Sequence, residues 1–413
     1  MTQPLQGIKV LDMSRVLAGP FAGRMLSDLG ADVVKLEPPE GDVTRLWGRK
    51  IAGISGYFTQ QNAGKRDISV DLTEARGRAL VLKLVAQADV LIENFRPDVM
   101  GRLGLDYPTL AAVNPRLIML SISGFGAGNE DSRRAAYAPI VHAEIGLVQR
   151  QAELSNAYPA ELACSVADTN AALHGLVALL AALYARAASG QGEHIDLAMV
   201  DANMATNDGM SHAMDGLSRP LPNEVHETAG GPLMLAGEFR FIWKRLVQVY
   251  ALDDGLPQEA TLEQKVNARR AASHRFFNET CESRNDVIAA LDKMNIAWGD
   301  VRSAADAMGL PSVRDRAVII EVDDRAGGTR PTTQSPYRFT HLQSGVRGGA
   351  PHLGEHNDEV LHDWLGLDKA AVNEWRDVLV QKMPLRVRVW LHLLSLIAFT
   401  LMLCSIILNQ KKL

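Results

Sequence analysis

Cysteine is scarce in this chain, and the three cysteines stand far apart, at positions 164, 281 and 404. None belongs to a closely spaced pair, which excludes a zinc ribbon and a disulfide framework and is typical of a reducing compartment. A basic excess is also lacking, because 43 Lys and Arg stand against 48 Asp and Glu, for a formal net charge of -5. Nucleic acid is therefore not an expected partner.

The first residues lack the basic patch and apolar run of a secretory signal, which predicts a cytoplasmic location. A long apolar run occupies residues 389–408 and is flanked by basic residues. About 20 apolar residues suffice to span a bilayer. Three interpretations of the tail 383–413 stay open: an apolar helix that associates with a membrane, a buried terminal helix, and a tail fused by a shifted reading frame.

The 413 residues are 47 % apolar and 22 % charged, which predicts a soluble globular chain with more than one structural unit. Short apolar runs alternate with helical segments over residues 1–125, which is typical of a parallel sheet with helices on its faces. We therefore predict an α/β fold with a Rossmann-like, doubly wound layer. The expected strands are 8–11, 31–36, 89–92 and 116–121, and the expected helices are 19–29, 79–88 and 109–114.

A helix is expected over 169–188, rich in Ala and Leu on nearly all sides and therefore predicted to be buried. A strand is expected over 193–199. Joints rich in Pro and Gly then mark a smaller α+β domain over 215–345, with a helix at 285–295. The predicted division is a large domain over 1–214, the smaller domain over 215–345, a return to the large domain over 346–382, and the tail 383–413.

Several short strings, in order along most of the chain, resemble those of class III CoA-transferases of the CaiB/BaiF type. The most specific is 92–97 (IENFRP), followed by Met100 and Arg102. The others are 7–12 (GIKVLD), 16–20 (VLAGP), 30–37 (GADVVKLE), 62–66 (NAGKR), 114–118 (NPRLI), 123–126 (SGFG), 167–170 (ADTN) and 354–357 (GEHN). The resemblance implies an enzyme that moves CoA from an acyl-CoA to a carboxylic acid. It also implies a homodimer of interlocked rings.

Asp168 is the candidate nucleophile, because CoA exchange between two acids requires a carboxylate that forms an anhydride and then a thioester. It stands at the start of an apolar helix, where backbone N–H groups and the helix dipole favour a negative charge. From the local sequence alone, an ordinary N-cap is the favoured interpretation of an aspartate at this point. The resemblance favours the nucleophile, since the family's reacting aspartate matches this residue. No metal and no permanently bound cofactor are required, because the thioester substrate is already activated.

The CoA site is expected to offer cations and backbone donors to the phosphates. The resemblance implies a cleft formed by Val16, Asn94, Phe95, Arg96, Met100 and Arg102, with Lys65 and Arg66 near the phosphates. Taken alone, each of these cations is typical of a solvated surface. One departure is Pro38, which stands where many relatives have an arginine on the adenine side.

Tyr137 matches a tyrosine near the reacting carboxylates of formyl-CoA-type relatives, although a core tyrosine is an alternative. Leu17 replaces a polar residue of those relatives, which favours an apolar acceptor pocket over a formyl or oxalyl substrate. Gly230 and Gly231 fit either a linker turn or a glycine loop that covers the intermediate.

Other interpretations are less well supported. The glycines at 124, 126 and 128 do not open an apolar helix, which argues against a dinucleotide loop. His352 and His356 have metal-ligand spacing but no supporting carboxylate or cysteine cluster. An α-methylacyl-CoA racemase needs an acid/base pair, and Tyr137 and Ala138 stand where relatives carry the base. A membrane-tethered acyl-CoA-binding protein without catalysis is the remaining alternative.

Overall fold

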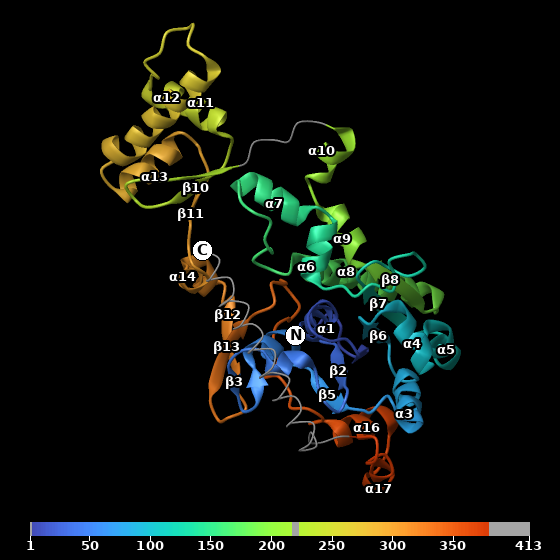
Figure 1. The fold of residues 1–413 in the computed structure, drawn as a ribbon. Coiled ribbons are helices and arrows are strands. Elements are labelled where there is room, and N and C mark those ends of the chain that lie inside the picture. Colours follow the sequence, from blue (N-terminus) through green and yellow to red (C-terminus); the bar gives the residue numbers. More distant parts are fainter. Residues whose placement is uncertain (1, 217–222, 380–413) are drawn as a thin grey trace, which may run out of the picture. The chain divides into compact units, whose positions relative to one another are not determined.

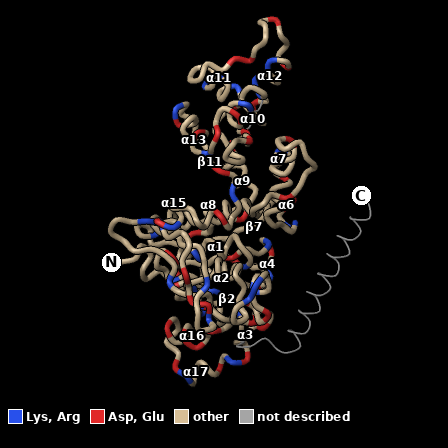
Figure 2. The backbone as a smooth tube through the Cα atoms, turned by 90° about the vertical axis from the view of Figure 1, so that its left-hand side faces the viewer, with Lys and Arg blue, Asp and Glu red and all other residues tan. Residues whose placement is uncertain are grey.

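The computed structural model describes residues 2–216 and 223–379. The predicted tail 383–413, with its apolar run 389–408, lies outside the described residues. The chain forms two compact units, Met1–Asn207 with Ala317–Leu413, and Asp208–Arg316 (Figure 1). Lys, Arg, Asp and Glu are distributed over both units (Figure 2).

The larger unit contains a six-stranded sheet in the order β5-β2-β1-β6-β7-β8, with parallel pairing throughout. Its strands are β1 (Lys9–Asp12), β2 (Asp32–Glu37), β5 (Arg66–Ser69), β6 (Val90–Glu93), β7 (Ile118–Ser123) and β8 (Glu193–Ala198). Counted along the chain, the spatial order is 3-2-1-4-5-6, which is typical of a Rossmann-like fold. The predicted α/β class and the four strands expected in the first 125 residues are confirmed, whereas the edge strand β5 was not among the expected strands.

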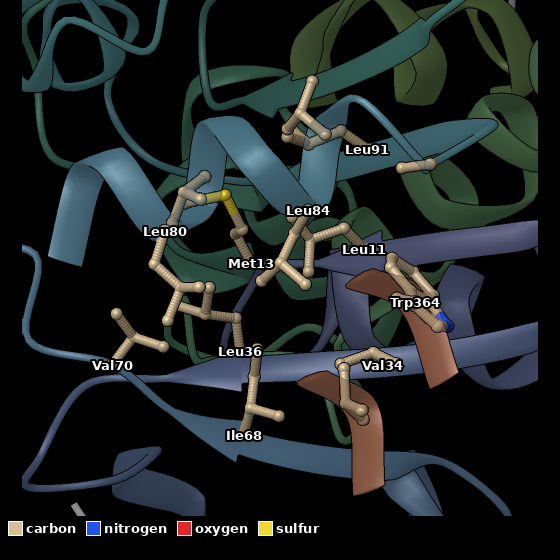
Figure 3. Close-up of a cluster of buried hydrophobic side chains, with 14 of the residues drawn as sticks. Leu11, Met13, Val34, Leu36, Ile68, Val70, Leu80, Leu84, Leu91 and Trp364 are labelled. Carbon is tan, nitrogen blue, oxygen red and sulfur yellow. The ribbon is translucent and has the colours of Figure 1, made fainter. Parts of the chain in front are cut away.

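Alternate residues of the four inner strands face two different apolar cores, which explains why these strands are apolar on both sides. One core contains Leu11, Val34 and Leu91 together with Leu84 and Trp364 (Figure 3). It includes side chains of the helices α3 (Ala75–Val85), α5 (Tyr107–Val113) and α16 (Asn357–Leu365). The other core includes side chains of α1 (Ala18–Asp28), α6 (Ala138–Glu144), α8 (Val166–Ser189) and α9 (Met199–Thr206).

Helix α8 differs from its prediction. Its inner face is buried through Ala171, Ala172, Leu176 and Leu179, but its outer face is not. Leu173, Val177, Leu180 and Tyr184 are exposed, and Tyr184 is 85 % accessible. These positions recur at helical spacing, so a single copy of the chain has an apolar stripe along this helix. By length and composition, α8 is also the one described helix that could cross a membrane.

The smaller unit, Asp208–Arg316, contains an antiparallel sheet in the order β11-β10-β9. A separate core joins β10 to α11, α12 and α13 through Leu235, Ile242, Ala272 and Leu291. The elements are α10 (Met210–Asp215), β9 (Glu224–His226), β10 (Leu233–Leu235), α11 (Phe239–Tyr250), α12 (Leu262–Arg275), a π-helical turn Phe276–Thr280, α13 (Arg284–Lys293), β11 (Trp298–Asp300), α14 (Ala304–Met308) and α15 (Pro311–Asp315).

Residues 317–345, which the sequence analysis assigned to the smaller domain, lie in the larger unit. They include the hairpin of β12 (Ile319–Asp323) and β13 (Thr329–Thr333). The buried Arg24 on α1 donates to the Thr333 carbonyl at 2.8 Å, and Arg330 donates to the Ile54 carbonyl at 2.9 Å. These long-range contacts attach the hairpin to the larger unit.

The remaining elements of the larger unit are short. They are a 3-10 turn Val43–Leu46, β3 (Lys50–Ile51), β4 (Ile54–Ser55), α2 (Gly56–Asn62), α4 (Pro97–Leu103), α7 (Leu147–Ser155) and α17 (Lys369–Asn373).

Candidate active site

A pocket lies where the chain leaves the adjacent strands β1 and β6 at their carboxyl ends. Strand order reverses at this pair, and ligands of open parallel sheets bind at such a point. The lining residues come from the end of β7, from the loops after β1, β6 and β7, and from the starts of α1, α4, α8 and α9. They are Arg15, Val16, Ala18, Asn94, Phe95, Arg96, Pro97, Ile122, Ser123, Gly124, Ser132, Arg134, Ala135, Ala136, Tyr137, Asp168 and Met199.

Asp168 lies in the first turn of α8, and its carboxylate faces the pocket. Ser165 is the N-cap of this helix, so the alternative that Asp168 is an ordinary N-cap is wrong. The backbone N–H groups of Ala18 and Ala138, the first residues of α1 and α6, interact with the carboxylate and favour its charged form. Burial outweighs them and raises the pKa of Asp168 to about 6. The carboxylate is therefore ionised near neutral pH but poorly solvated.

The N–H group of Ala18 is held in place by a clamped loop. Val16 has a φ of 70°, a left-handed conformation that strains a β-branched residue. Its N–H donates to Asp42 Oδ2 at 3.0 Å. Asn94 accepts from the Arg15 N–H and donates to the Arg15 carbonyl, both at 2.8 Å. These contacts offset the strain and fix the chain entering α1.

Two arginines at the pocket are available to an anion. Neither Arg15 nor Arg96 forms an ion pair with another described residue, and both line the pocket. The Arg15 guanidinium lies over the Phe95 ring, 5.4 Å from its centroid. Arg134 differs, because it pairs with Asp131 at 3.0 Å and also with Glu144. The sequence analysis did not name Arg15 as a site residue. Its position directly before Val16, which was predicted to line the cleft, could have indicated it.

Tyr57, which the sequence analysis did not name, interacts electrostatically with Asp168 but does not line the pocket. Burial raises its pKa to about 12, and the negative charges of Asp168 and Asp42 contribute to this rise. The ring packs edge-on against Trp47, with the centroids 5.0 Å apart. Tyr57 lies on α2, only a few residues before the string 62–66, so its place in the chain was the one local signal for it.

Six of the predicted site residues meet in the pocket: Val16, Asn94, Phe95, Arg96, Tyr137 and Asp168. Tyr137 is the N-cap of α6 and is 62 % accessible, so the alternative of a core tyrosine is wrong. Asn94 lines the pocket, while both polar atoms of its side chain bind the backbone of Arg15. Its main contribution is therefore to the shape of the loop.

Four predicted residues do not line this pocket. Lys65 is buried, and its Nζ donates to Asp12 Oδ2 at 2.7 Å and to Asn62 Oδ1 at 2.9 Å. Arg66 pairs with Asp32 at 2.6 Å and with two further carboxylates. Met100 belongs to the core around α3. Arg102 is exposed and lies 3.3 Å from Asp98.

Three other sequence features have ordinary surroundings. Leu17 is buried as the N-cap residue of α1 and does not line the pocket. The glycine string after β7 is followed by a loop that reaches Tyr137, which agrees with rejecting a dinucleotide-binding turn. His356 accepts the Asp67 N–H through Nδ1 at 3.1 Å, which accounts for one of its two ring nitrogens.

Comparison with known proteins decides the family. The model described as CoA-transferase family III matches residues 5–357. The chain belongs to this family. Among family III relatives, a succinate–glutarate CoA-transferase of Agrobacterium fabrum is 34 % identical over 394 residues, with 89 % of this chain and 97 % of the relative covered. A succinyl-CoA–D-citramalate CoA-transferase of Chloroflexus aurantiacus is 31 % identical over 392 residues, with 88 % and 95 % covered.

A solved structure agrees with this family III assignment. The crystal structure of a CaiB/BaiF family protein from Brucella suis has a TM-score of 0.74 at 31 % identity, and covers 88 % of this chain and 100 % of that one. The resemblance found in the sequence is therefore confirmed. The chain is a transferase whose general activity is CoA transfer, with CoA thioesters as substrates.

Proposed function

We propose that Asp168 itself carries first the acyl group and then CoA between two carboxylic acids. The observation that supports this most directly is the position of its carboxylate, which faces a pocket and two helix-terminal backbone N–H groups. A nucleophile must be ionised, reachable and placed beside donors that stabilise an oxyanion. Asp168 meets these three conditions.

The reaction begins when an Asp168 oxygen attacks the donor thioester carbonyl. The C–S bond breaks, which leaves a mixed anhydride and the CoA thiolate. The thiolate attacks the aspartyl carbonyl, breaks the anhydride C–O bond and releases the donor acid, so that CoA is held as an aspartyl thioester. The acceptor carboxylate then attacks this thioester and expels the thiolate. Attack of the thiolate on the acceptor carbonyl forms the new acyl-CoA and regenerates the Asp168 carboxylate.

The donors around Asp168 suit the attack of the CoA thiolate and the attack of the acceptor carboxylate on the aspartyl carbonyl. When the aspartyl carbonyl becomes tetrahedral, its oxygen takes up negative charge near the N–H groups of Ala18 and Ala138. Because these donors belong to the fixed backbone, they require little reorganisation during the reaction. We assign the phosphates of CoA to Arg15 and Arg96, the two cations at the pocket without an ion-pair partner among the described residues.

We further propose that the protein is a homodimer that covers the apolar stripe of α8. Four large apolar side chains, Leu173, Val177, Leu180 and Tyr184, are exposed along this one helix. Contiguous apolar patches on soluble proteins commonly mark an interface. The stripe begins within two turns of Asp168, so subunit contacts at α8 would also restrain the start of the helix. Size-exclusion chromatography with light scattering tests this, and Val177→Glu should shift the dimer toward monomer.

The decisive experiment for the chemistry is trapping. The protein is incubated with succinyl-CoA, glutaryl-CoA or acetyl-CoA, the first two being suggested by the acids in the relatives' names. Hydroxylamine or borohydride is added, and peptides are analysed by mass spectrometry. A modification at Asp168 that depends on acyl-CoA is expected. Turnover without any modification, or modification of another residue, would overturn the proposal.

Two further measurements separate the alternatives. Exchange of the α-proton of a 2-methylacyl-CoA in the absence of an acceptor acid would favour a racemase. Binding of acyl-CoA without transfer to any of a panel of succinate, glutarate and citramalate would favour a binding protein. Transfer to one of these acids, lost in Asp168→Asn, supports the proposed function.

A further inference from the structure

The main chain of Ala167, directly before Asp168, is held by two buried side chains from different helices. His142 on α6 is 1 % accessible, and its Nε2 accepts the Ala167 N–H at 3.0 Å. Asn203 on α9 is 2 % accessible, and its Nδ2 donates to the Ala167 carbonyl at 3.0 Å. The N–H and the carbonyl of Ala167 are thus both bound by side chains.

The histidine takes over a role that the N-cap residue usually has. Ser165, the N-cap of α8, makes no side-chain capping hydrogen bond. Without His142, the Ala167 N–H in the first turn would have no acceptor in the helix itself. The contact requires a neutral ring, with the proton on Nδ1. Burial lowers the pKa of His142, against a smaller opposing effect of Glu161, and so favours that neutral ring.

His142 Nδ1 is buried and has no hydrogen-bond partner among the described residues. An unpaired buried polar atom destabilises the fold, so an apolar side chain would avoid this cost. The ring is therefore not explained by packing alone. What distinguishes it is the Nε2 contact with the residue next to the nucleophile.

The same helix α6 contacts the nucleophile at a second point. Ala138, at its first position, directs its N–H at the Asp168 carboxylate, and His142 follows four residues later, one helical turn along the same face. One short helix thus holds the main chain before Asp168 and also supplies a donor to its side chain. Asn203 connects Ala167 to α9, and within that helix its Nδ2 also donates to the Met199 carbonyl at 2.7 Å. Met199 lines the pocket.

We propose that His142 and Asn203 are positioning residues, which fix the main-chain N–H and carbonyl of Ala167 and thereby the orientation of the Asp168 carboxylate toward the N–H groups of Ala18 and Ala138. This inference rests on the proposed role of Asp168 as nucleophile. Neither residue lines the pocket, so neither is expected to contribute to the binding of acyl-CoA. Misplacement of a reacting group by about 1 Å lowers rates by about a hundredfold.

The test uses matched variants of the full chain. His142→Phe keeps an aromatic ring but removes the acceptor, whereas His142→Gln keeps an acceptor on a chain of similar length. Asn203→Ala removes two hydrogen bonds to backbone carbonyls and a third that Oδ1 accepts from Asn170 Nδ2, just as Asn114 Oδ1 accepts the Arg116 N–H. Its control is Asn114→Ala, because Asn114 Nδ2 also donates to two backbone carbonyls, those of Val85 at 2.9 Å and Ala88 at 2.8 Å, at the opposite end of the sheet.

We expect His142→Phe and Asn203→Ala to lower kcat between about tenfold and a hundredfold, with KM for acyl-CoA within twofold of the parent. His142→Gln should recover most of the lost rate. Asn114→Ala should lower the melting temperature about as much as Asn203→Ala and leave kcat within twofold. An unchanged kcat in Asn203→Ala, or equal losses in Asn203→Ala and Asn114→Ala, would overturn the inference even if His142→Phe fails to fold.

Trapping at Asp168 separates this inference from the function on which it rests. If the parent forms no adduct at Asp168, the proposed function is wrong. If the parent forms the adduct and Asn203→Ala forms it at the same rate, Asp168 is the nucleophile and the positioning role is wrong. A slower appearance of the adduct in Asn203→Ala, with an unchanged rate in Asn114→Ala, supports both.

Discussion

Replacement of Asp168 by asparagine is expected to abolish CoA transfer and, at neutral pH, to stabilise the fold. Burial raises the pKa of this carboxyl from 3.8 to about 6. A group whose folded-state pKa lies above its unfolded value binds its proton more tightly when folded. The charged form therefore destabilises the parent protein, and this penalty grows as the pH rises from 3.8 to 6. Asparagine has no charge and avoids it.

The size of the effect follows from the two pKa values. The interval from 3.8 to about 6, at about 1.36 kcal/mol for each pH unit, corresponds to about 3 kcal/mol as an upper figure. About 2 kcal/mol of this should develop between pH 4.5 and pH 8. For a unit of this size, the difference in melting temperature between variant and parent should grow by about 4 °C over that range.

The assay is thermal melting of both proteins from pH 4.5 to pH 8, at one protein concentration so that subunit association does not differ. Asp106→Asn is the matched control, because Asp106 caps α5 and hydrogen bonds from Thr109 lower its pKa. Its charge stabilises the folded state, and this contribution is almost complete above the unfolded pKa of 3.8. The difference in melting temperature between Asp106→Asn and the parent should therefore stay nearly constant from pH 4.5 to pH 8. A constant or shrinking advantage of Asp168→Asn with rising pH would refute the reasoning.

Three further results are expected. Below about pH 6, kcat/KM for acyl-CoA should fall about tenfold for each pH unit that the pH decreases, because only the ionised Asp168 attacks. Initial rates from pH 4.5 to 8 test this, and a kcat/KM that does not change with pH would contradict it. Arg96→Ala should raise KM for acyl-CoA about tenfold with little change in kcat. Arg76→Ala, on the distant α3, should change neither constant. An equal rise in KM in the two variants would count against the assignment of Arg96 to the CoA phosphates. Lys65→Met should destabilise the fold by about 3–5 kcal/mol, because it leaves the buried Asp12 carboxylate unpaired. Urea denaturation checks this against the exposed Lys369→Met, and an equal midpoint for the two variants would argue that the ion pair contributes little.

The four inner strands of the parallel sheet, β2, β1, β6 and β7, were predictable because they are buried on both faces and therefore appear as short continuous apolar runs. The expected strands 31–36 and 116–121 correspond to β2 and β7 within two residues. The helix expected over 169–188 corresponds to α8, but the prediction that it is buried on nearly all sides is wrong. The composition of a helix shows how much of its surface is apolar. Which faces other residues cover depends on segments far along the chain or on a second copy of the protein.

The site was partly predictable. The strings around Asn94 and Asp168 gave the residues after β6 and at the start of α8, since each string is local and both lie at the carboxyl end of the sheet. Lys65 shows the limit of this approach. A lysine in a glycine-containing string suggests an anion-binding residue, but its partner Asp12 is 53 positions away and is brought to it by the fold. His142 is hidden for the same reason, because its acceptor role appears only when α6 packs beside α8.

Because the smaller unit is inserted within the sequence of the larger one, the insertion determines which core the nascent chain can complete first during synthesis. Residues 208–316 are translated before the hairpin β12–β13 and before α16. Until then, the guanidinium of Arg24 lacks the Thr333 carbonyl, and one face of the sheet lacks Val360 and Trp364. The six strands thus emerge from the ribosome first but reach their final packing last. The inserted unit, whose core uses only its own residues, is complete earlier.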